Sequence, residues 1–397
     1  MAKLRVAMIA PPWLSIPPNG YGGIEEVIYN LTNGLKKLGV DVELFTIKRS
    51  TIPGVKKHYY YQDEQYAHIH KPLYETTPVA VTQVMFALKA IAEDGKYDLI
   101  HDHNGFLGPL ALYWANRYGG LPPALHTHHG PPFSDKQRLE VGIPDNLPMW
   151  GQFGGGRGLY LVGISASLMK PAPEELKLIT LPPVHHGLDV TKFPYLQKKA
   201  EHFITLGRFS RDKGQHTAVQ LCDELGYKLE MAGIVAGISN LKQLVLELAN
   251  PLSNYRSNGD FQYYSDHILP TTIKNPKIRY IGNISGQRKL SFFAQAKAFL
   301  FPIDWEEPFG MVLIEALACG TPVVAMNRGS VPEIIEHGKN GFIANTVKEF
   351  RHYMQKVDEI DPAACRRTVE EKFSVDKMAR NYLDRYKQIL SLEKSRP

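Results

Sequence analysis

Cysteine is scarce in this sequence, which has three cysteines in 397 residues, namely Cys222, Cys319 and Cys365. They lie far apart along the chain and form no Cys-x-x-Cys pair. This spacing argues against a disulfide framework and against a cysteine-bound zinc ion. It predicts reduced thiols in a cytoplasmic protein.

Long apolar runs and strong charge are also missing. The apolar run in MAKLRVAMIAPPW is too short for a membrane span, and it leads into a loop and a helix, so we interpret it as a first strand and not as a signal peptide. The net charge is only +6, and no run of basic and aromatic residues stands out. We therefore expect no nucleic-acid partner, whereas anionic ligands or an acidic membrane face are compatible with this charge.

The composition that remains, 44% apolar and 10% aromatic, is typical of a soluble globular protein, and 397 residues suggest two domains. Short β-rich runs alternate with amphipathic helices, which predicts an α/β fold with parallel, doubly wound sheets. The expected strands of the first sheet are at residues 4–10, 41–47, 98–103, 124–129 and 159–165. Those of the second are at residues 202–208, 229–233, 278–282, 298–302 and 322–326.

We expect the linker at about residues 186–201, between a domain at 1–190 and a domain at 191–375. The last expected helix, at residues 374–390, has one apolar face, but its sequence does not say which domain it covers. In open sheets of this kind, ligands bind at the carboxyl ends of the strands. The residues of interest should therefore lie in the loops that follow the strands.

The stretch EEPFGMVLIEALACGTPVV places one carboxylate, Glu315, inside an otherwise apolar helix. A buried and unpaired carboxylate would cost several kcal/mol, roughly, so Glu315 should have a partner or a ligand. Glu307 lies in the preceding loop, and eight residues of helix would span about 12 Å, which suits two groups of one extended ligand. Gly310 would let the backbone approach that ligand. The alternative is that Glu315 is a core carboxylate paired with a Lys or an Arg.

Two further segments are typical of anion sites. Arg208 and Lys213 lie in LGRFSRDKGQ, on a turn between a strand and a helix, and suit a diphosphate; the alternative is an exposed basic turn. Gly22 and Gly23 precede the first helix, where free backbone amides attract anions. A plain glycine turn is the alternative there.

Histidines gather at the ends of two expected strands, in LHTHHGPPF and DLIHDHNGF. A metal site is one reading, but successive side chains of a strand point to opposite faces, so these histidines should not all converge on one ion. We favour a single histidine facing a ligand, with the others structural. The histidines concerned, with one aspartate among them, are His101, Asp102, His103, His126, His128 and His129.

The order of these motifs resembles that of the family-4 retaining glycosyltransferases of GT-B fold. The matching residues are Gly22 and Gly23, Thr127 to His129, Arg208 with Lys213, and Glu307 with Glu315. The segment VHHGLD, residues 184–189, resembles the family's interdomain turn, with His186 where Asn is more usual. The resemblance implies two Rossmann-like domains that face a central cleft, with the last helix, at about 376–397, packing back on the first domain.

The resemblance also implies retaining transfer of a hexosyl unit from a nucleotide-diphosphate sugar to an acceptor hydroxyl, without an obligatory metal or other cofactor. Glu315 would bind the donor's ribose and Glu307 a hydroxyl of the donor sugar, beside the amides of Phe309 and Gly310. The other implied contacts are Arg208 and Lys213 with the diphosphate, Gly22 and Gly23 with the same group, Gly282 and Asn283 with the base, and His129 with the sugar. Front-face attack is favoured, with Glu307 as nucleophile the weaker option.

Other activities on this architecture are a sugar-nucleotide epimerase, a phosphorylase, and a non-catalytic sugar-nucleotide-binding protein. A glycosyltransferase would use a sugar, glycan, lipid-linked or small-molecule acceptor, chosen by loops around residues 50–80 and 130–158. We expect a cytoplasmic location, and peripheral membrane contact is compatible with the family.

Overall fold

The computed structural model describes residues 3–20, 22–69, 71–134, 144–153 and 158–395. The chain divides into two compact units. Unit 1 comprises Met1–Leu188 with Ser374–Pro397, and unit 2 comprises Asp189–Phe373. Parts of the predicted acceptor loops, at 135–143 and 154–157, lie outside the described residues.

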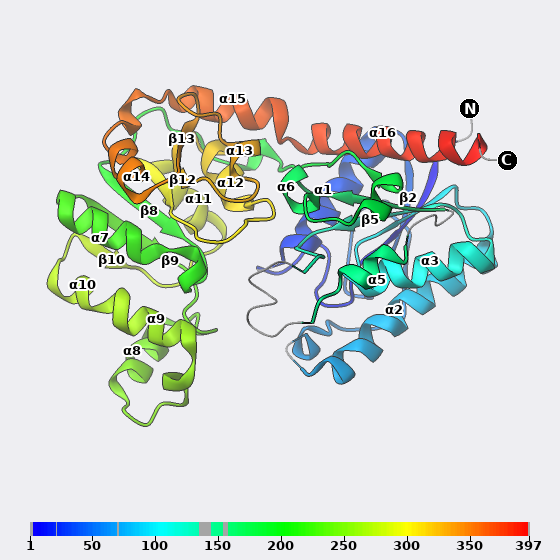
Figure 1. The fold of residues 1–397 in the computed structure, drawn as a ribbon, viewed down its shortest axis with the longest axis horizontal. Coiled ribbons are helices and arrows are strands. Elements are labelled where there is room, and N and C mark those ends of the chain that lie inside the picture. Colours follow the sequence, from blue (N-terminus) through cyan, green and yellow to red (C-terminus); the bar gives the residue numbers. More distant parts are fainter. Residues whose placement is uncertain (1–2, 21, 70, 135–143, 154–157, 396–397) are drawn as a thin grey trace. The chain divides into compact units, whose positions relative to one another are not determined.

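In unit 1, the described residues form a seven-stranded sheet of order β3-β2-β1-β4-β5-β6-β7, in which every neighbouring pair is parallel (Figure 1). The strands are β1 (Arg5–Ile9), β2 (Asp41–Thr46), β3 (Lys57–Tyr59), β4 (Leu99–Asp102), β5 (Ala124–His128), β6 (Leu159–Gly163) and β7 (Thr180–Leu181). The helices of this unit are α1 (Gly23–Lys37), α2 (Leu73–Asp94), α3 (Leu107–Gly119), α5 (Leu147–Gly151), α6 (Ala166–Met169) and α16 (Val375–Lys394), with 3-10 turns at Tyr66–His68 and Glu174–Leu178.

Both faces of this sheet are buried under helices. Val6 and Met8 of β1 belong to one core with residues of α1 and α16, whereas Ala7 and Ile9 belong to a second core with residues of α2. Alternate side chains of a strand point to opposite faces, so a strand covered on both sides must be apolar throughout. This is why β1 has the continuous sequence VAMI.

Helix α16 lies against α1, and its residues Met378, Ala379, Tyr382, Tyr386 and Ile389 are buried in the first of these cores. The two helices approach closely at Gly34, where an added Cβ would stand 2.7 Å from the Cβ of Ala379. The backbone N–H of Val375 donates to the carbonyl of Leu188, so the return of the chain to unit 1 is tied to the point where it leaves.

In unit 2, the described residues form a six-stranded parallel sheet of order β10-β9-β8-β11-β12-β13. Its strands are β8 (His202–Leu206), β9 (Lys228–Ala232), β10 (Ile278–Tyr280), β11 (Ala298–Phe301), β12 (Val323–Met326) and β13 (Gly341–Ala344). Its helices are α7 (Gln215–Leu225), α8 (Leu241–Ala249), α9 (Gly259–His267), α10 (Leu269–Lys274), α11 (Gly286–Gln295), α12 (Met311–Ala318), α13 (Val331–Ile334), α14 (Val347–Met354) and α15 (Pro362–Lys372), with 3-10 turns at Val190–Lys192, Arg211–Lys213, Asn254–Ser257 and Val357–Glu359.

The strand orders locate the switch points, where chain connections leave in opposite directions along the sheet. In unit 1 the switch lies between β1 and β4, and in unit 2 it lies between β8 and β11. The crevice outside the carboxyl ends of such a strand pair is where ligands bind in open α/β sheets. The predicted α/β class of parallel, doubly wound sheets is confirmed. None of the described helices is both long and apolar enough to span a bilayer.

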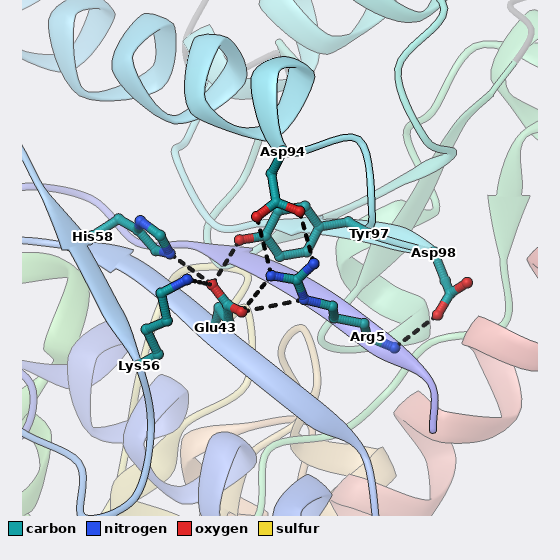
Figure 2. Close-up of polar contacts among 7 residues, drawn as sticks. All are labelled: Arg5, Glu43, Lys56, His58, Asp94, Tyr97 and Asp98. Carbon is teal, nitrogen blue, oxygen red and sulfur yellow. Dashed lines mark hydrogen bonds and ion pairs between the residues drawn. The ribbon is translucent and has the colours of Figure 1, made fainter. Parts of the chain in front are cut away.

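A polar network stabilises unit 1 around Glu43 of β2, which has an 8% exposed side chain (Figure 2). Its Oε1 accepts from Arg5 Nη2 at 2.6 Å, and its Oε2 accepts from Tyr97 Oη at 2.8 Å and lies 2.7 Å from His58 Nε2. Arg5 Nη1 also donates to Asp94 at 2.7 Å. Because Arg5 is the first residue of β1, this network sits away from the carboxyl ends of the strands.

Candidate active site

Lys213 is placed by a turn that follows β8 and precedes α7. Gly214 ends this turn with φ 68°, and an added Cβ there would lie 1.9 Å from the carbonyl oxygen of Pro302, just after β11. The N–H of Asp304 also donates to the carbonyl of Asp212 at 2.8 Å. These backbone contacts hold the two loops of the switch point together.

Glu307 lies in the second of these loops and forms an ion pair with Lys213. Lys213 Nζ is 2.9 Å from Glu307 Oε2, which also accepts from Trp305 Nε1 at 3.1 Å. The ammonium group lies over the Trp305 ring, 4.4 Å from its centroid. Behind the loop, the N–H of Ser330 donates to the carbonyl of Glu307. The structure thus joins two predicted residues that are 94 positions apart in sequence.

Glu315 of α12 has a cation partner. Its Oε1 accepts from Lys289 Nζ of α11 at 2.7 Å, with the two side chains 14% and 27% exposed. The Lys partner named in the alternative is therefore present, whereas the ribose contact implied by the resemblance stays a prediction. The other oxygen, Glu315 Oε2, is buried and has no hydrogen-bond partner among the described residues. Buried polar atoms are nearly always hydrogen-bonded, so this oxygen is a candidate for a ligand contact.

Arg208 follows β8 and has a mostly exposed side chain. Its guanidinium lies 3.6 Å from Asp212 and 3.5 Å from Asp260, both of them long contacts. Its carbonyl accepts from Gln215 Nε2 at 2.8 Å, which fixes the backbone while the charged end faces solvent. The structure places Arg208 in the same turn region as Lys213 but pairs the two cations with different carboxylates.

The other predicted residues of unit 2 also follow strands of its sheet. Gly310 has φ 78° and immediately precedes α12, whereas Phe309 is buried and its ring packs on Phe373. Gly282 has φ 85° and accepts from the N–H of Gly233, and the next residue, Asn283, is exposed. All four lie beyond β10 or β11, at the same edge of the sheet as Lys213 and Glu307.

Gly22 and Gly23 belong to unit 1, at the start of α1. Gly22 has φ 155°, and an added Cβ would lie 2.6 Å from Pro18 Cβ, so packing alone requires a glycine there. Gly23 opens the helix, and an added Cβ would meet nothing within 4 Å. Packing therefore explains the glycine at position 22, but it does not explain the glycine at position 23.

The histidines of unit 1 divide into two groups. His101 and His126 are engaged within the protein, because His101 contacts Tyr386 Oη at 2.6 Å and Thr127 Oγ1 at 2.8 Å, and His126 Nδ1 lies 2.6 Å from Asp102 Oδ2. The others, His103, His128 and His129, line a pocket. The single ligand-facing histidine stays a prediction, but three histidines line this pocket: His103 and His129 from the loops after β4 and β5, and His128 from the end of β5.

This pocket has a volume of about 480 Å³, within the usual range for small-molecule sites. Its described lining residues are Ile24, His103, Gly105, Phe106, His128, His129, Gly130, Pro131, Pro132, Asn146 and Trp150. Trp150 Nε1 and Asn146 Nδ2 both donate to the carbonyl of Pro132 at 2.9 Å, which fixes one wall. Among the described residues, no group of His, Cys, Asp and Glu has the arrangement of a metal site.

His103 and His129 form a hydrogen-bonded pair in this pocket, with 2.8 Å between His103 Nδ1 and His129 Nε2. Burial, with neighbouring imidazoles, holds the pKa of each well below its usual value. Both are therefore neutral near pH 7.

Sequence reasoning missed Lys289 and Trp305 and did not assign His103 to the site. Trp305 stood in the loop already singled out, directly before Glu306 and Glu307, and an aromatic ring at that place was a usable signal. Lys289 gave none, since it is one of several polar residues on α11. His103 shared its strand end with His101, and the pattern alone did not separate the two.

Both units of this chain match models of known protein families. Residues 191–371 match the family model "Glycosyl transferases group 1", and residues 21–152 match "Glycosyltransferase Family 4". Together the two models cover most of the chain and fall one in each unit.

Three individual proteins illustrate the similarity. The chain is 23% identical to alpha-maltose-1-phosphate synthase of Mycolicibacterium smegmatis, over 86% of this chain and 84% of that protein. It is 27% identical to spore coat protein SA of Bacillus subtilis, over 47% of this chain and only 48% of that protein. The crystal structure of Anabaena HepE in complex with UDP-glucose superposes with a TM-score of 0.61 and 16% identity, covering 97% of this chain and 100% of that one, which supports a common fold.

Proposed function

Because the chain belongs to the group 1 glycosyltransferases and has the GT-B fold, we propose that it transfers a hexosyl unit from a nucleotide-diphosphate sugar to an acceptor hydroxyl, with retention and without an obligatory metal. The observation that carries the proposal is the Lys213–Glu307 pair at the switch point of unit 2. A similar fold binds UDP-glucose in Anabaena HepE.

In this proposal, positive charge stabilises the leaving group. As the bond from the anomeric carbon to oxygen breaks, negative charge develops on the diphosphate, and Lys213 and Arg208 are the cations that neutralise it. Fixed cations at that point supply what a metal ion would otherwise supply. Glu307 then binds a hydroxyl of the donor sugar, and the acceptor's proton passes to the leaving phosphate in front-face attack.

Glu315 Oε2 is the proposed acceptor of hydrogen bonds from the donor's ribose. Lys289 holds the carboxylate through Oε1, while Oε2 lacks a partner among the described residues. A ribose diol donates two hydrogen bonds and carries no charge. An uncharged diol is therefore a suitable partner for Glu315 Oε2, because Lys289 already balances the charge of this carboxylate through Oε1.

The Glu315→Gln variant should bind the preferred nucleoside diphosphate about 10–100-fold more weakly, because hydrogen bonds to a charged group contribute roughly 1.5–3 kcal/mol. Calorimetry with UDP, GDP and ADP measures this. The matched control is the 2′,3′-dideoxy form of the same nucleotide, for which variant and wild type should bind alike. Equal affinity of the two proteins for the intact nucleotide would refute the ribose role.

One assay separates the proposed reaction from its rivals. The protein is incubated with nucleotide sugars, with and without acceptors, and released nucleotide and products are measured. A transferase requires an acceptor hydroxyl for rapid release, a phosphorylase requires inorganic phosphate, and an epimerase releases free nucleotide without an acceptor. A non-catalytic binding protein releases none.

A further inference from the structure

Trp305 lies in a loop whose backbone is fixed on both sides of it. The N–H of Asp304 donates to the carbonyl of Asp212 at 2.8 Å. The carbonyl of Glu307 accepts from the N–H of Ser330 at 2.9 Å. The indole between these two anchors is half-buried. A large ring on a fixed backbone is suited to hold neighbouring side chains in place.

The Trp305 indole contacts both members of the Lys213–Glu307 ion pair. Its Nε1 donates to Glu307 Oε2 at 3.1 Å, and Lys213 Nζ lies over its ring, 4.4 Å from the centroid. The side chains of Lys213 and Glu307 are only 21% and 12% exposed, so solvent screens these contacts less than it screens a surface pair. Tryptophan is also the aromatic residue that attracts a cation most strongly.

This arrangement leaves part of each charged group available for a ligand. Glu307 Oε2 accepts from both Lys213 and Trp305, whereas none of the described residues donates to Glu307 Oε1. The ammonium group of Lys213 has three N–H donors, and Glu307 uses one of them. Oε1 is thus available to a hydroxyl of the donor sugar, and the remaining N–H groups to a phosphate oxygen, while the indole keeps both side chains in place.

The indole contacts also matter at the moment when Lys213 turns to the leaving diphosphate. The bond from Lys213 to Glu307 Oε2 then weakens, and a largely buried carboxylate without any donor would cost free energy. Trp305 Nε1 still donates to that oxygen. The ring face meanwhile keeps the ammonium group near both acceptors, because its attraction for a cation does not depend on the direction of a single N–H.

We propose that Trp305 is a positioning residue for the transfer reaction. Its ring holds the ammonium group of Lys213 where negative charge develops on the leaving diphosphate, and its N–H holds the carboxylate of Glu307. This inference rests on the proposed glycosyl transfer and adds a residue that acts through Lys213 and Glu307. A tryptophan that merely filled space in the loop would affect stability but would not respond to the electron density of its ring.

Fluorinated tryptophans at position 305 separate the electrostatic role of the ring from its size. Each fluorine withdraws electron density from the ring face and weakens its attraction for a cation, whereas the N–H remains and becomes a slightly stronger donor. We expect the rate of nucleotide release to fall stepwise through the 5-fluoro, 5,7-difluoro and 5,6,7-trifluoro forms, about 3–10-fold in all. In a Lys213→Met background, the same series should leave the rate unchanged.

Two ordinary substitutions test the ring and the N–H together. Trp305→Phe keeps a ring face but loses the donor to Glu307, whereas Trp305→Leu loses both. We expect the rate to fall about 3–10-fold in Trp305→Phe, because Lys213 still donates to Glu307, and about 10–100-fold in Trp305→Leu. The matched control is 5,6,7-trifluorotryptophan at position 114 of α3, where the ring packs on Tyr113 and Tyr118, and it should leave the rate unchanged.

The rate is measured as single-turnover nucleotide release, by transfer or by slow hydrolysis, from UDP-glucose, UDP-N-acetylglucosamine, GDP-mannose and ADP-glucose. A rate that stays constant across the fluorinated series, or that falls by the same factor in the Lys213→Met background, would overturn the inference. If Lys213→Ala still lowers kcat, that result leaves the glycosyltransferase assignment standing. Failure to release nucleotide from any of these sugars would instead overturn the proposed function, and the inference with it.

Discussion

The Lys213→Ala variant is expected to lose about 10²–10³-fold in kcat. Removal of one preorganised group that stabilises developing negative charge costs roughly that much in well-studied enzymes. Lys213 is well placed for this role because its Nζ is held 2.9 Å from Glu307 and over the Trp305 ring, at the switch point of the sheet. Single-turnover release of nucleotide at saturating donor measures the effect.

Two controls keep this result interpretable. Lys339→Ala removes a half-exposed cation paired with Glu336 in the same unit, and should leave kcat unchanged. Thermal unfolding of Lys213→Ala shows whether Glu307, which keeps only the Trp305 bond, destabilises the loop. A folded Lys213→Ala variant that retains kcat within a factor of ten or so would exclude Lys213 as the main stabiliser of the leaving group.

The Glu43→Ala variant should lower the free energy of unfolding of unit 1 by about 3 kcal/mol. It removes the common partner of Arg5, His58 and Tyr97, and leaves buried donors unsatisfied. The loss should fall at the lower end of the range for buried pairs, because Arg5 keeps Asp94.

Urea unfolding followed by tryptophan fluorescence in a Trp305→Phe background measures this loss, since the remaining tryptophans, Trp13, Trp114 and Trp150, all lie in unit 1. The control, Asp63→Ala, breaks an ion pair with Arg49 whose side chains are 64% and 68% exposed, and should cost at most about 1 kcal/mol. If Glu43→Ala and Asp63→Ala lower the free energy of unfolding by the same amount, the network around Glu43 stabilises unit 1 no more than a surface ion pair does.

The same network predicts a dependence on pH. Burial alone would raise the pKa of Glu43, but hydrogen bonds from His58, Arg5, Tyr97 and Lys56 outweigh it and lower the pKa from 4.5 to about 2. A carboxyl whose folded pKa is depressed contributes stability above its unfolded value, and this is lost as the pH falls towards the folded value. The stability difference between wild type and Glu43→Ala should therefore shrink between about pH 4.5 and pH 2.

The loops of the site could be predicted from the sequence because strand-helix alternation determines where carboxyl ends of strands fall. Lys213 and Glu307 follow separate strands, and the parallel order brings those strands together. Their ion pair could not be predicted, since it depends on the backbone contact of Gly214 with Pro302 across 88 positions (302 minus 214). The cation beside Glu315 could not be predicted either, because nothing in the order of residues along α11 distinguishes Lys289 from the other polar residues of that helix.

The strands that escaped prediction are β3, β7 and β13. Each lies at an edge of its sheet. β3 and β7 have only three and two residues, too few for a periodic pattern. β13 has the sequence GFIA, where the glycine and the short run resemble a turn. β3 has no buried residue, so it needs less apolar sequence than the central strands that alternation detects.

The discontinuity of unit 1 has a consequence for biosynthesis. Five side chains of its core come from α16, the last of them Ile389, whereas the rest of that core is complete by Val184. A ribosome must therefore translate the whole of unit 2 before the nascent first unit can close its core around Leu31 and Leu35. During that interval the apolar face of α1 lacks the helix that covers it, and chaperones that bind exposed apolar surface should bind the nascent chain there.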